Sequence, residues 1–147
     1  MNEIEKYWQV FADKNKLTNA AYEAWAFGDN PKTADELAKL VLEGKKTATS
    51  SRFVKGDKLP QVGEYNIILD GQGHPVCITQ TLSVEIMPFK NVSAEHAYLE
   101  GEDDRTLASW RNVHRDFFTR ECLDEGKTFT EEIPCVCEVF KAIRDNA

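Results

Sequence analysis

The stretch TADELAKLVLEGKKTATSSR, residues 33–52, contains the change of pattern that decides the fold. Its first half predicts a helix, because Thr33 and Glu36 have the spacing of a capping box and apolar residues recur on one face. Gly44 is a typical helix stop, and β-type sequence follows it. The buried face of this helix is expected to hold Leu37, Leu40 and Val41.

The residues before this stretch predict two more helices. Ile4, Trp8 and Phe11 recur at helical spacing and form one apolar stripe. Residues 19–27, with the sequence NAAYEAWAF, predict a second helix that ends at Gly28.

The residues after this stretch predict mainly strands. Residues 64–70 and 75–86 are apolar and β-prone, and the GQGH turn between them predicts a hairpin. Residues 106–120 return to helical spacing, and residues 133–143 predict a closing strand. The apolar face of that last helix is expected to hold Leu107, Trp110, Val113, His114 and Phe117. Early helices and later strands indicate an α+β fold around a small, mostly antiparallel sheet or barrel.

Length and composition fit one folded domain. The chain has 147 residues, of which 41% are hydrophobic, enough to build a core. No apolar run approaches the ~18 residues of a membrane helix, and the N-terminus lacks the apolar core of a signal peptide. We therefore expect a cytoplasmic protein with no membrane partner. The oligomeric state stays open at this point.

The cysteines and the net charge narrow the choice of partners. Cysteines 77, 122, 135 and 137 lack the spacing of a zinc site, so we interpret them as small core residues and expect no metal or cofactor. A net charge of −7 disfavours a broad nucleic-acid surface, and no DNA partner is expected. A small nucleoside, or a short RNA at a local basic patch, fits this charge better.

Lys46 and Thr49 form a first candidate site. A threonine hydroxyl is a poor nucleophile until a base removes its proton, and a desolvated lysine can be that base. The alternative is structural, because a lysine just after a helix end interacts favourably with the helix dipole. On a regular strand Lys46, Ser50 and Arg52 would face one side, with Thr49 and Ser51 on the other. Lys46 and Thr49 then meet only where the chain bends.

A second polar group surrounds Glu100. On a short helix, His96 and Glu100 would share a face at i, i+4 spacing. Glu100 lies between Leu99 and Gly101, where a carboxylate can orient water or carry a proton. The acidic residues 102–104 fit the capping of the next helix, and a magnesium cluster is the least favoured alternative.

Aromatic residues supply candidate pocket walls. Trp25 and Asp29 lie at a predicted helix end and can line a pocket for a flat base. Trp110 and His114 share one predicted helical face. Core packing is the alternative for these rings.

Five motifs, taken in order, resemble those of ASCH domain proteins, especially small bacterial single-domain members. They are WAFGD (25–29), ADELAKLVLEGKKTAT (34–49), LP-x-VGEY (59–65), LEGEDD (99–104) and W-x-x-x-H-x-x-FF (110–118). The resemblance implies a PUA-like fold, which is a small β-barrel flanked by helices. It also implies a single ASCH domain over residues 1–147, with a helical extension at about residues 1–24.

The central family signature is G-x-K-x-x-T-x-R. Gly44, Lys46 and Thr49 match it directly. The arginine position is occupied by Ser51, and Arg52 follows one residue later.

Some small ASCH proteins are amidohydrolases that remove the acetyl group from N4-acetylcytidine, and others are reported as ribonucleases. By motif position the resemblance implies Thr49 as nucleophile, Lys46 as its base and Glu100 as an assisting group, with no cofactor. The substrate-binding residues expected around them are Trp25, Asp29, Ser51, Arg52, Trp110 and His114.

The alternative is an RNA- or nucleotide-binding module without turnover. In it Lys46 and Arg52 would contact phosphate, Thr49 and Ser51 would donate hydrogen bonds, and an aromatic ring would stack on a base.

Overall fold

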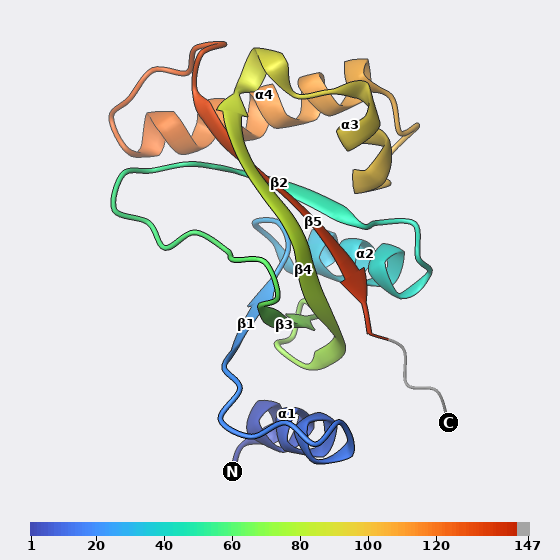
Figure 1. The fold of residues 1–147 in the computed structure, drawn as a ribbon. Helices are drawn as coiled ribbons and strands as arrows, with labels where there is room; N and C mark the ends of the chain where they lie inside the picture. Colours follow the sequence, from blue (N-terminus) through green and yellow to red (C-terminus); the bar gives the residue numbers. More distant parts are fainter. Residues whose placement is uncertain (144–147) are drawn as a thin grey trace.

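The structure is a computed structural model that describes residues 1–143. Figure 1 shows a curled sheet at the centre, with helices at both ends and behind it. The elements are α1 (Glu3–Lys14), β1 (Tyr22–Ala26), α2 (Pro31–Leu42), β2 (Ala48–Arg52), β3 (Tyr65–Leu69), β4 (Pro75–Pro88), η1 (Phe89–Asn91), α3 (Ala94–Glu100), α4 (Leu107–Asp124) and β5 (Pro134–Ala142).

The sheet has the strand order β1-β3-β4-β5-β2. Only the β1–β3 pair is parallel, whereas β3–β4, β4–β5 and β5–β2 are antiparallel. The expected α+β fold with a mostly antiparallel sheet is therefore confirmed. The sheet forms a half-barrel, because the outer strands β1 and β2 are not neighbours in the strand order.

The long strand β4 produces the curl of the sheet. Its first half pairs with β3 and its second half with β5, so it belongs to both sides of the half-barrel. A register shift between Thr81 and Ser83 lies near the point where the two pairings meet. Such a bulge bends the strand and increases its twist.

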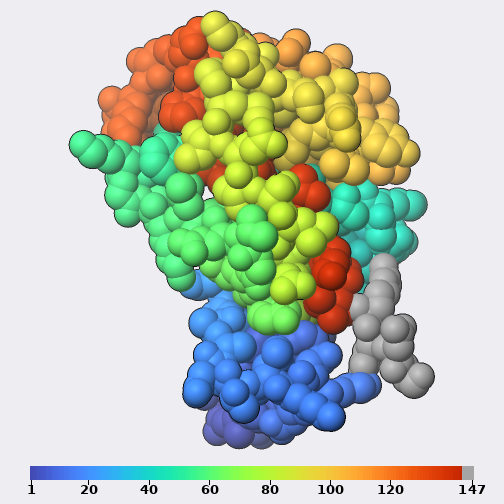
Figure 2. Space-filling model, viewed as in Figure 1, coloured from blue at the N-terminus to red at the C-terminus, as the bar shows by residue number. Residues whose placement is uncertain are grey.

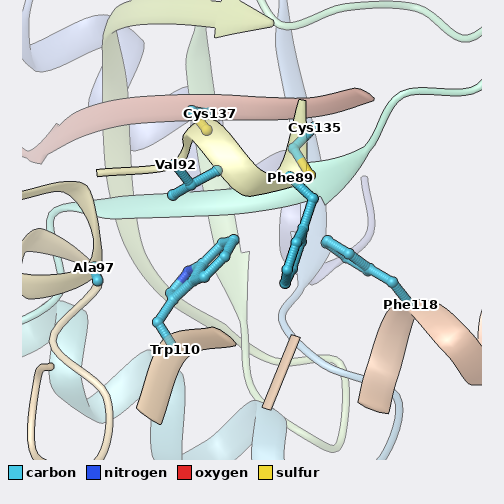
Figure 3. Packing of buried hydrophobic residues seen from close by; sticks show 7 residues of the cluster. All are labelled: Phe89, Val92, Ala97, Trp110, Phe118, Cys135 and Cys137. Carbon is cyan, nitrogen blue, oxygen red and sulfur yellow. The ribbon is translucent and has the colours of Figure 1, made fainter. Parts of the chain in front are cut away.

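One face of the sheet is covered by α1 at one end and by α3 and α4 at the other. At the α1 end, Trp8 packs with the buried side chains of Ile67 and Ile78. At the other end, Cys135 and Cys137 pack with the aromatic rings of η1 and α4 (Figure 3). Figure 2 shows these two helical regions as the lower and upper ends of the molecule.

The opposite face of the sheet is covered by α2. Ile68 and Phe140 point to this side and form a buried cluster with Phe27, Ala38 and Val41. Residues 53–64, which connect β2 to β3, loop out along the left side of the sheet in Figure 1. The two faces therefore have separate cores.

The predicted helix over residues 19–27 is wrong. Residues Tyr22–Ala26 form strand β1, which pairs in parallel with β3. Helical and extended structure are hard to distinguish by periodicity in so short an apolar run. Pairing with β3 decides the outcome here, because it joins Trp25 to Ile68 across the sheet.

The predicted start of the third helix is also wrong. Its N-cap is Asn30, whose side chain accepts a hydrogen bond from the Thr33 amide, and Pro31 occupies the first turn. Proline fits this position because its missing N–H has no partner there in any helix. The stop at Gly44 is confirmed, since Gly44 has φ 77° and follows the C-cap Glu43.

The remaining elements match the sequence, apart from one exposed side chain. The first helix, the hairpin, the helix after residue 106 and the closing strand are present, but Val113 is 44% exposed. The four cysteines are buried, as expected of small core residues. Within the described residues, no helix is long and apolar enough to cross a membrane.

Candidate functional site

Side chains along β2 alternate between the two faces of the sheet. The neighbouring hydroxyl residues Thr49 and Ser50 therefore point to opposite faces. Ser50 lies opposite Cys137 on β5, whereas Thr49 lies opposite Glu138. Directly opposed residues of an antiparallel pair share a face. Ser50 therefore faces α3 and α4, and Thr49 faces the other side of the sheet.

Lys46, just before β2, is a buried cation that is only 1% exposed. Its Nζ donates to Ala48 O at 2.8 Å and to Glu102 Oε2 at 2.8 Å, and lies 3.7 Å from Glu100 Oε1. Nζ also lies 5.1 Å from the centre of the Phe27 ring. Lys46 thus contacts Glu100 beside one face and Phe27, which belongs to the core of the opposite face.

Glu100, the last residue of α3, is the other buried ion, with 1% of its surface exposed. Its Oε2 accepts hydrogen bonds from Ser50 Oγ at 2.5 Å and Trp110 Nε1 at 2.7 Å, and lies 3.0 Å from His96 Nε2. Its Oε1 lies 3.5 Å from His114 Nε2 and 3.7 Å from Lys46 Nζ. The two oxygens of one carboxylate therefore have different sets of neighbours.

The charges around Glu100 support its ionised form. Burial by itself raises the pKa of Glu100, but hydrogen bonds from His114 and His96 and the charge of Lys46 outweigh it, so the pKa lies well below its ordinary value. Burial lowers the pKa of His114, but the hydrogen bond and charge of Glu100 outweigh this, and the net pKa is raised. Both shifts favour a Glu100 carboxylate beside a His114 imidazolium.

An aromatic stack holds the α4 side of the site. The Trp110 and His114 rings stack with centroids 4.3 Å apart, and Trp110 stacks on Phe89 at 5.2 Å. Figure 3 shows Trp110 and Phe89 side by side beneath the sheet. His114 Nδ1 lies 2.9 Å from the Trp110 carbonyl oxygen, which leaves Nε2 directed at Glu100.

A small cavity lies beside Glu100, with Glu102 and Asp103 on its wall. Its volume of about 10 Å³ is the space of roughly one water molecule. A carboxylate at such a cavity can orient a water molecule for attack.

The structure brings four of the sequence-predicted residues together: Lys46, Glu100, Trp110 and His114. The other five lie elsewhere. Thr49 faces the opposite side of the sheet, and its hydroxyl makes no hydrogen bond among residues 1–143. Trp25 donates to Asn66 Oδ1 at 2.9 Å on that same side.

The three remaining candidates contact neither the Lys46–Glu100 pair nor Thr49. Ser51 is exposed, and Asp29 is ion-paired to Arg120 at 2.9 Å near the surface. Arg52 reaches the C-terminal half of α4, where it is ion-paired to Glu121 and Glu125.

Sequence reasoning did not single out Ser50 or Glu102 as functional. The alternation of β2 was the available signal for Ser50, because it placed Ser50 on the Lys46 side. Glu102 was assigned to helix capping, whereas its side chain lies against Lys46. Within the described chain, no group of three or more histidine, cysteine, aspartate or glutamate residues is arranged to hold a metal ion.

The ASCH domain family model matches residues 23–144. The chain belongs to the ASCH domain family. The match begins at the second residue of β1 and includes every later element of the structure described above.

Solved structures agree with this membership and support a PUA-like α+β fold for this ASCH domain. Protein EF3133 from Enterococcus faecalis V583 has a TM-score of 0.89 and 37% identity, covering 96% of this chain and 88% of its own. The ASCH domain from Lactobacillus crispatus JV V101 has a TM-score of 0.83 and 33% identity, covering 91% and 92%. Among curated proteins, none matches this ASCH domain significantly.

Proposed function

We propose that this ASCH domain is a metal-independent amidohydrolase that acts on N4-acylated cytidine-type nucleosides. The observation that carries the proposal is the buried pair of Lys46 and Glu100, each 1% exposed and 3.7 Å apart, at positions that match the family motifs. Buried charges are expensive to maintain unless they are paired, so such a pair in a family with hydrolases is a candidate for chemistry.

Thr49 is the proposed nucleophile, because Ser50 is already engaged. Ser50 Oγ contacts Glu100, His96 and the Sγ of Cys137, which leaves little room for an acyl carbon. Among residues 1–143, the Thr49 hydroxyl makes no hydrogen bond. Ser50 instead positions the carboxylate of Glu100.

The proposed reaction has two steps. Lys46 first passes a proton to Glu100, whose Oε1 lies 3.7 Å from Nζ. Thr49 Oγ1 then attacks the acyl carbon while the neutral Lys46 amine takes the hydroxyl proton; the C–N4 bond breaks and that proton passes to N4, which releases cytidine. A water molecule oriented by Glu100 next attacks the Thr49 ester; the Lys46 amine takes the water proton and passes it to Thr49 Oγ1 as the ester bond breaks, which releases the carboxylic acid. Lys46 links the two steps because it lies between Glu100 and the Phe27 side of the sheet.

The test is turnover of N4-acetylcytidine by purified protein, with cytidine and acetate measured by chromatography. Lys46→Ala and Thr49→Ala are expected to reduce kcat/KM by at least about 100-fold, in line with the loss of a base or a nucleophile. Thr49→Ser keeps a hydroxyl and is the matched control, which should retain measurable turnover. Full activity in Thr49→Ala would show that Thr49 is not the nucleophile. No turnover of any N4-acylated cytidine would refute the proposal.

The binding-module alternative depends on Arg52 as a phosphate contact. Arg52 Nε lies 3.3 Å from Glu121 Oε1, and NH2 is ion-paired to Glu125, so its guanidinium is already neutralised. This arrangement disfavours phosphate at Arg52. A steep loss of ligand affinity with salt would support phosphate-led binding, whereas a neutral nucleoside should bind almost independently of salt.

A further inference from the structure

A second buried polar cluster lies on the face of the sheet opposite to Ser50. Trp25 Nε1 donates to Asn66 Oδ1 at 2.9 Å, and Asn66 Nδ2 donates to Thr81 Oγ1 at 3.4 Å. Thr81 Oγ1 in turn donates to Glu138 Oε2 at 2.7 Å. One continuous row of hydrogen bonds therefore crosses the sheet from β1 through β3 and β4 to β5. Within the described residues, none of these four side chains hydrogen-bonds to Lys46 or Glu100.

This cluster shares its side of the sheet with Thr49. Glu138 lies opposite Thr49 in the β2–β5 register and opposite Val84 in the β4–β5 register. Trp25 is on β1, and Thr49 is on β2, the two outer strands of the half-barrel. The cluster thus extends from one open border of the sheet to the strand that holds the proposed nucleophile.

Glu138 is an unusual residue for a sheet interior. It is 6% exposed, and Lys46, the cation whose charge acts on it, is ion-paired to Glu102 and Glu100 instead. Burial raises the pKa of Glu138, and the charge of Glu64 adds to this effect. A carboxyl group that keeps its proton offers one donor and one acceptor side by side.

Aromatic rings connect Trp25, at the β1 end of this row, to Lys46. The Trp25 and Phe27 rings meet edge to face with centroids 4.6 Å apart, and Lys46 Nζ lies 5.1 Å from the Phe27 ring. Trp25 is only half-buried. A flat heterocycle that packs against Trp25 would therefore have polar side chains beside its edge. The Trp25 and Phe27 rings would connect it to Lys46.

We propose that Glu138, Asn66 and Trp25 recognise the base of the substrate, with Glu138 pairing to the edge of a pyrimidine that carries a donor beside an acceptor. This proposal rests on the proposed amidohydrolase function only for the acyl group of the substrate; recognition of the base does not require hydrolysis. Cytosine and its N4-acyl derivatives present N3 as acceptor and N4–H as donor on this edge. Proteins that read single bases use such edge pairing together with aromatic stacking.

The position of Thr49 gives this pairing a consequence for catalysis. Because Thr49 and Glu138 are directly opposed on adjacent strands, a base paired to Glu138 through N4–H holds its N4 substituent close to β2. Glu138 is then a specificity-determining residue, and the hydroxyl of Thr49 meets the acyl carbon of a base held in that pose.

The test measures binding by calorimetry in a Thr49→Ala background, which cannot form the Thr49 ester, with cytidine and N4-acetylcytidine as probes. Glu138→Gln keeps one donor and one acceptor and should change Kd less than about 3-fold, whereas Glu138→Ala should weaken binding at least 10-fold, about 1.4 kcal/mol. Glu85→Ala, on the opposite face of β4, is the matched control and should leave Kd unchanged. N4,N4-dimethylcytidine lacks the N4–H donor and should bind at least 10-fold more weakly than cytidine.

Thr81→Val provides a second variant if Glu138→Ala does not fold, because it keeps the shape of the side chain and removes both the donor to Glu138 and the acceptor of Asn66 Nδ2. It should weaken cytidine binding, with an unchanged circular dichroism spectrum. Equal affinities of the parent and of the Glu138→Ala or Thr81→Val variant would overturn the proposal, as would equal affinity for the dimethyl probe. Cytidine binding that depends on Glu138, without hydrolysis by the wild-type protein, would uphold this site and refute the amidohydrolase.

Discussion

The two neighbouring serines of β2 have opposite environments. Ser50 Oγ donates to Glu100 Oε2 at 2.5 Å, whereas Ser51 is exposed. Ser50→Ala should lower the free energy of unfolding by about 1–3 kcal/mol, because a buried carboxylate loses a donor. Ser51→Ala should change it by less than about 0.5 kcal/mol. Urea denaturation of both variants measures the difference, and equal midpoints would show that the Ser50 contact contributes nothing.

The ion pair of His114 and Glu100 predicts how stability changes with pH. A raised pKa in the folded state means that folding binds the proton, so this contribution is complete below about pH 6.5 and is lost as pH rises through the folded pKa. The free energy of unfolding should therefore fall from pH 6 upward. His114→Gln should flatten this dependence, while His74→Gln, at an exposed site, should keep most of it. Urea midpoints at several pH values provide the measurement, and an unchanged slope in His114→Gln would contradict the assignment.

Single residues show what sequence alone could and could not predict about the site. The spacing of His96 and Glu100 predicted their contact, since i, i+4 positions meet on any helix. The row from Trp25 to Glu138 was not predictable, because it depends on the pairing of four strands that are far apart in the sequence. Thr49 was assigned through the family motif, and the pairing of β2 with β5 is what opposes it to Glu138.

At the scale of an element, the end of α3 fixes the distance between the two buried ions. Gly101 has φ 73°, and a Cβ there would lie 2.3 Å from Lys45 O and 3.1 Å from Lys46 N. Gly101→Ala should therefore push the chain before β2 away from α3 and separate Lys46 from Glu100. Gly126 has φ 71°, and a Cβ there would meet no atom within 4 Å, so Gly126→Ala carries the same backbone strain without the clash.

The two glycine variants separate strain from contact. Gly126→Ala should lower the free energy of unfolding by about 1 kcal/mol, the usual penalty for a non-glycine residue in this backbone region. Gly101→Ala should lower it by clearly more and also reduce N4-acetylcytidine turnover. Thermal melting and activity assays measure both effects, and equal losses in the two variants would mean that the close approach at Gly101 is relaxed easily.

The same scale explains the one element that sequence reasoning assigned to the wrong class. Residues 19–27 contain alanines that favour a helix, but also Tyr22 and Trp25, which fit a strand. The cross-strand partners on β3 decide between them, and they are not visible in the local sequence. Longer elements such as α2 and α4 carry enough turns for periodicity to identify them.

At the scale of the whole molecule, α1 is part of the structure although the family match begins at residue 23. Trp8 is 8% exposed and stacks on Tyr22 with ring centroids 4.7 Å apart. Trp8→Ala should lower the free energy of unfolding by about 3–5 kcal/mol, as for other buried aromatic residues. Val10→Ala, at a position that is 69% exposed on the same helix, is the control and should have little effect. Chemical denaturation that finds both variants as stable as wild type would show that α1 packs too weakly to support the sheet.

The fold class was predictable because the pattern changes from helical to extended at Gly44, although strand β1 comes before that change and helices α3 and α4 come after it. The open border between β1 and β2 was not predictable, since no local signal reports whether a curled sheet closes. For the same reason, the sequence alone did not show that the polar residues around Glu100 and those around Glu138 lie on opposite faces of one sheet.

Alternation along β2 and β5 makes this protein suitable for directed redesign. Ser50 and Cys137 belong to one face, and Thr49 and Glu138 to the other, so neighbouring codons encode side chains with separate surroundings. A library that varies the Glu138 face but keeps Thr49 would retain the buried ions around Glu100 and the proposed nucleophile. Variants selected from it for other acylated heterocycles would keep the proposed catalytic groups, and Lys46 would still contact both Glu100 and Phe27.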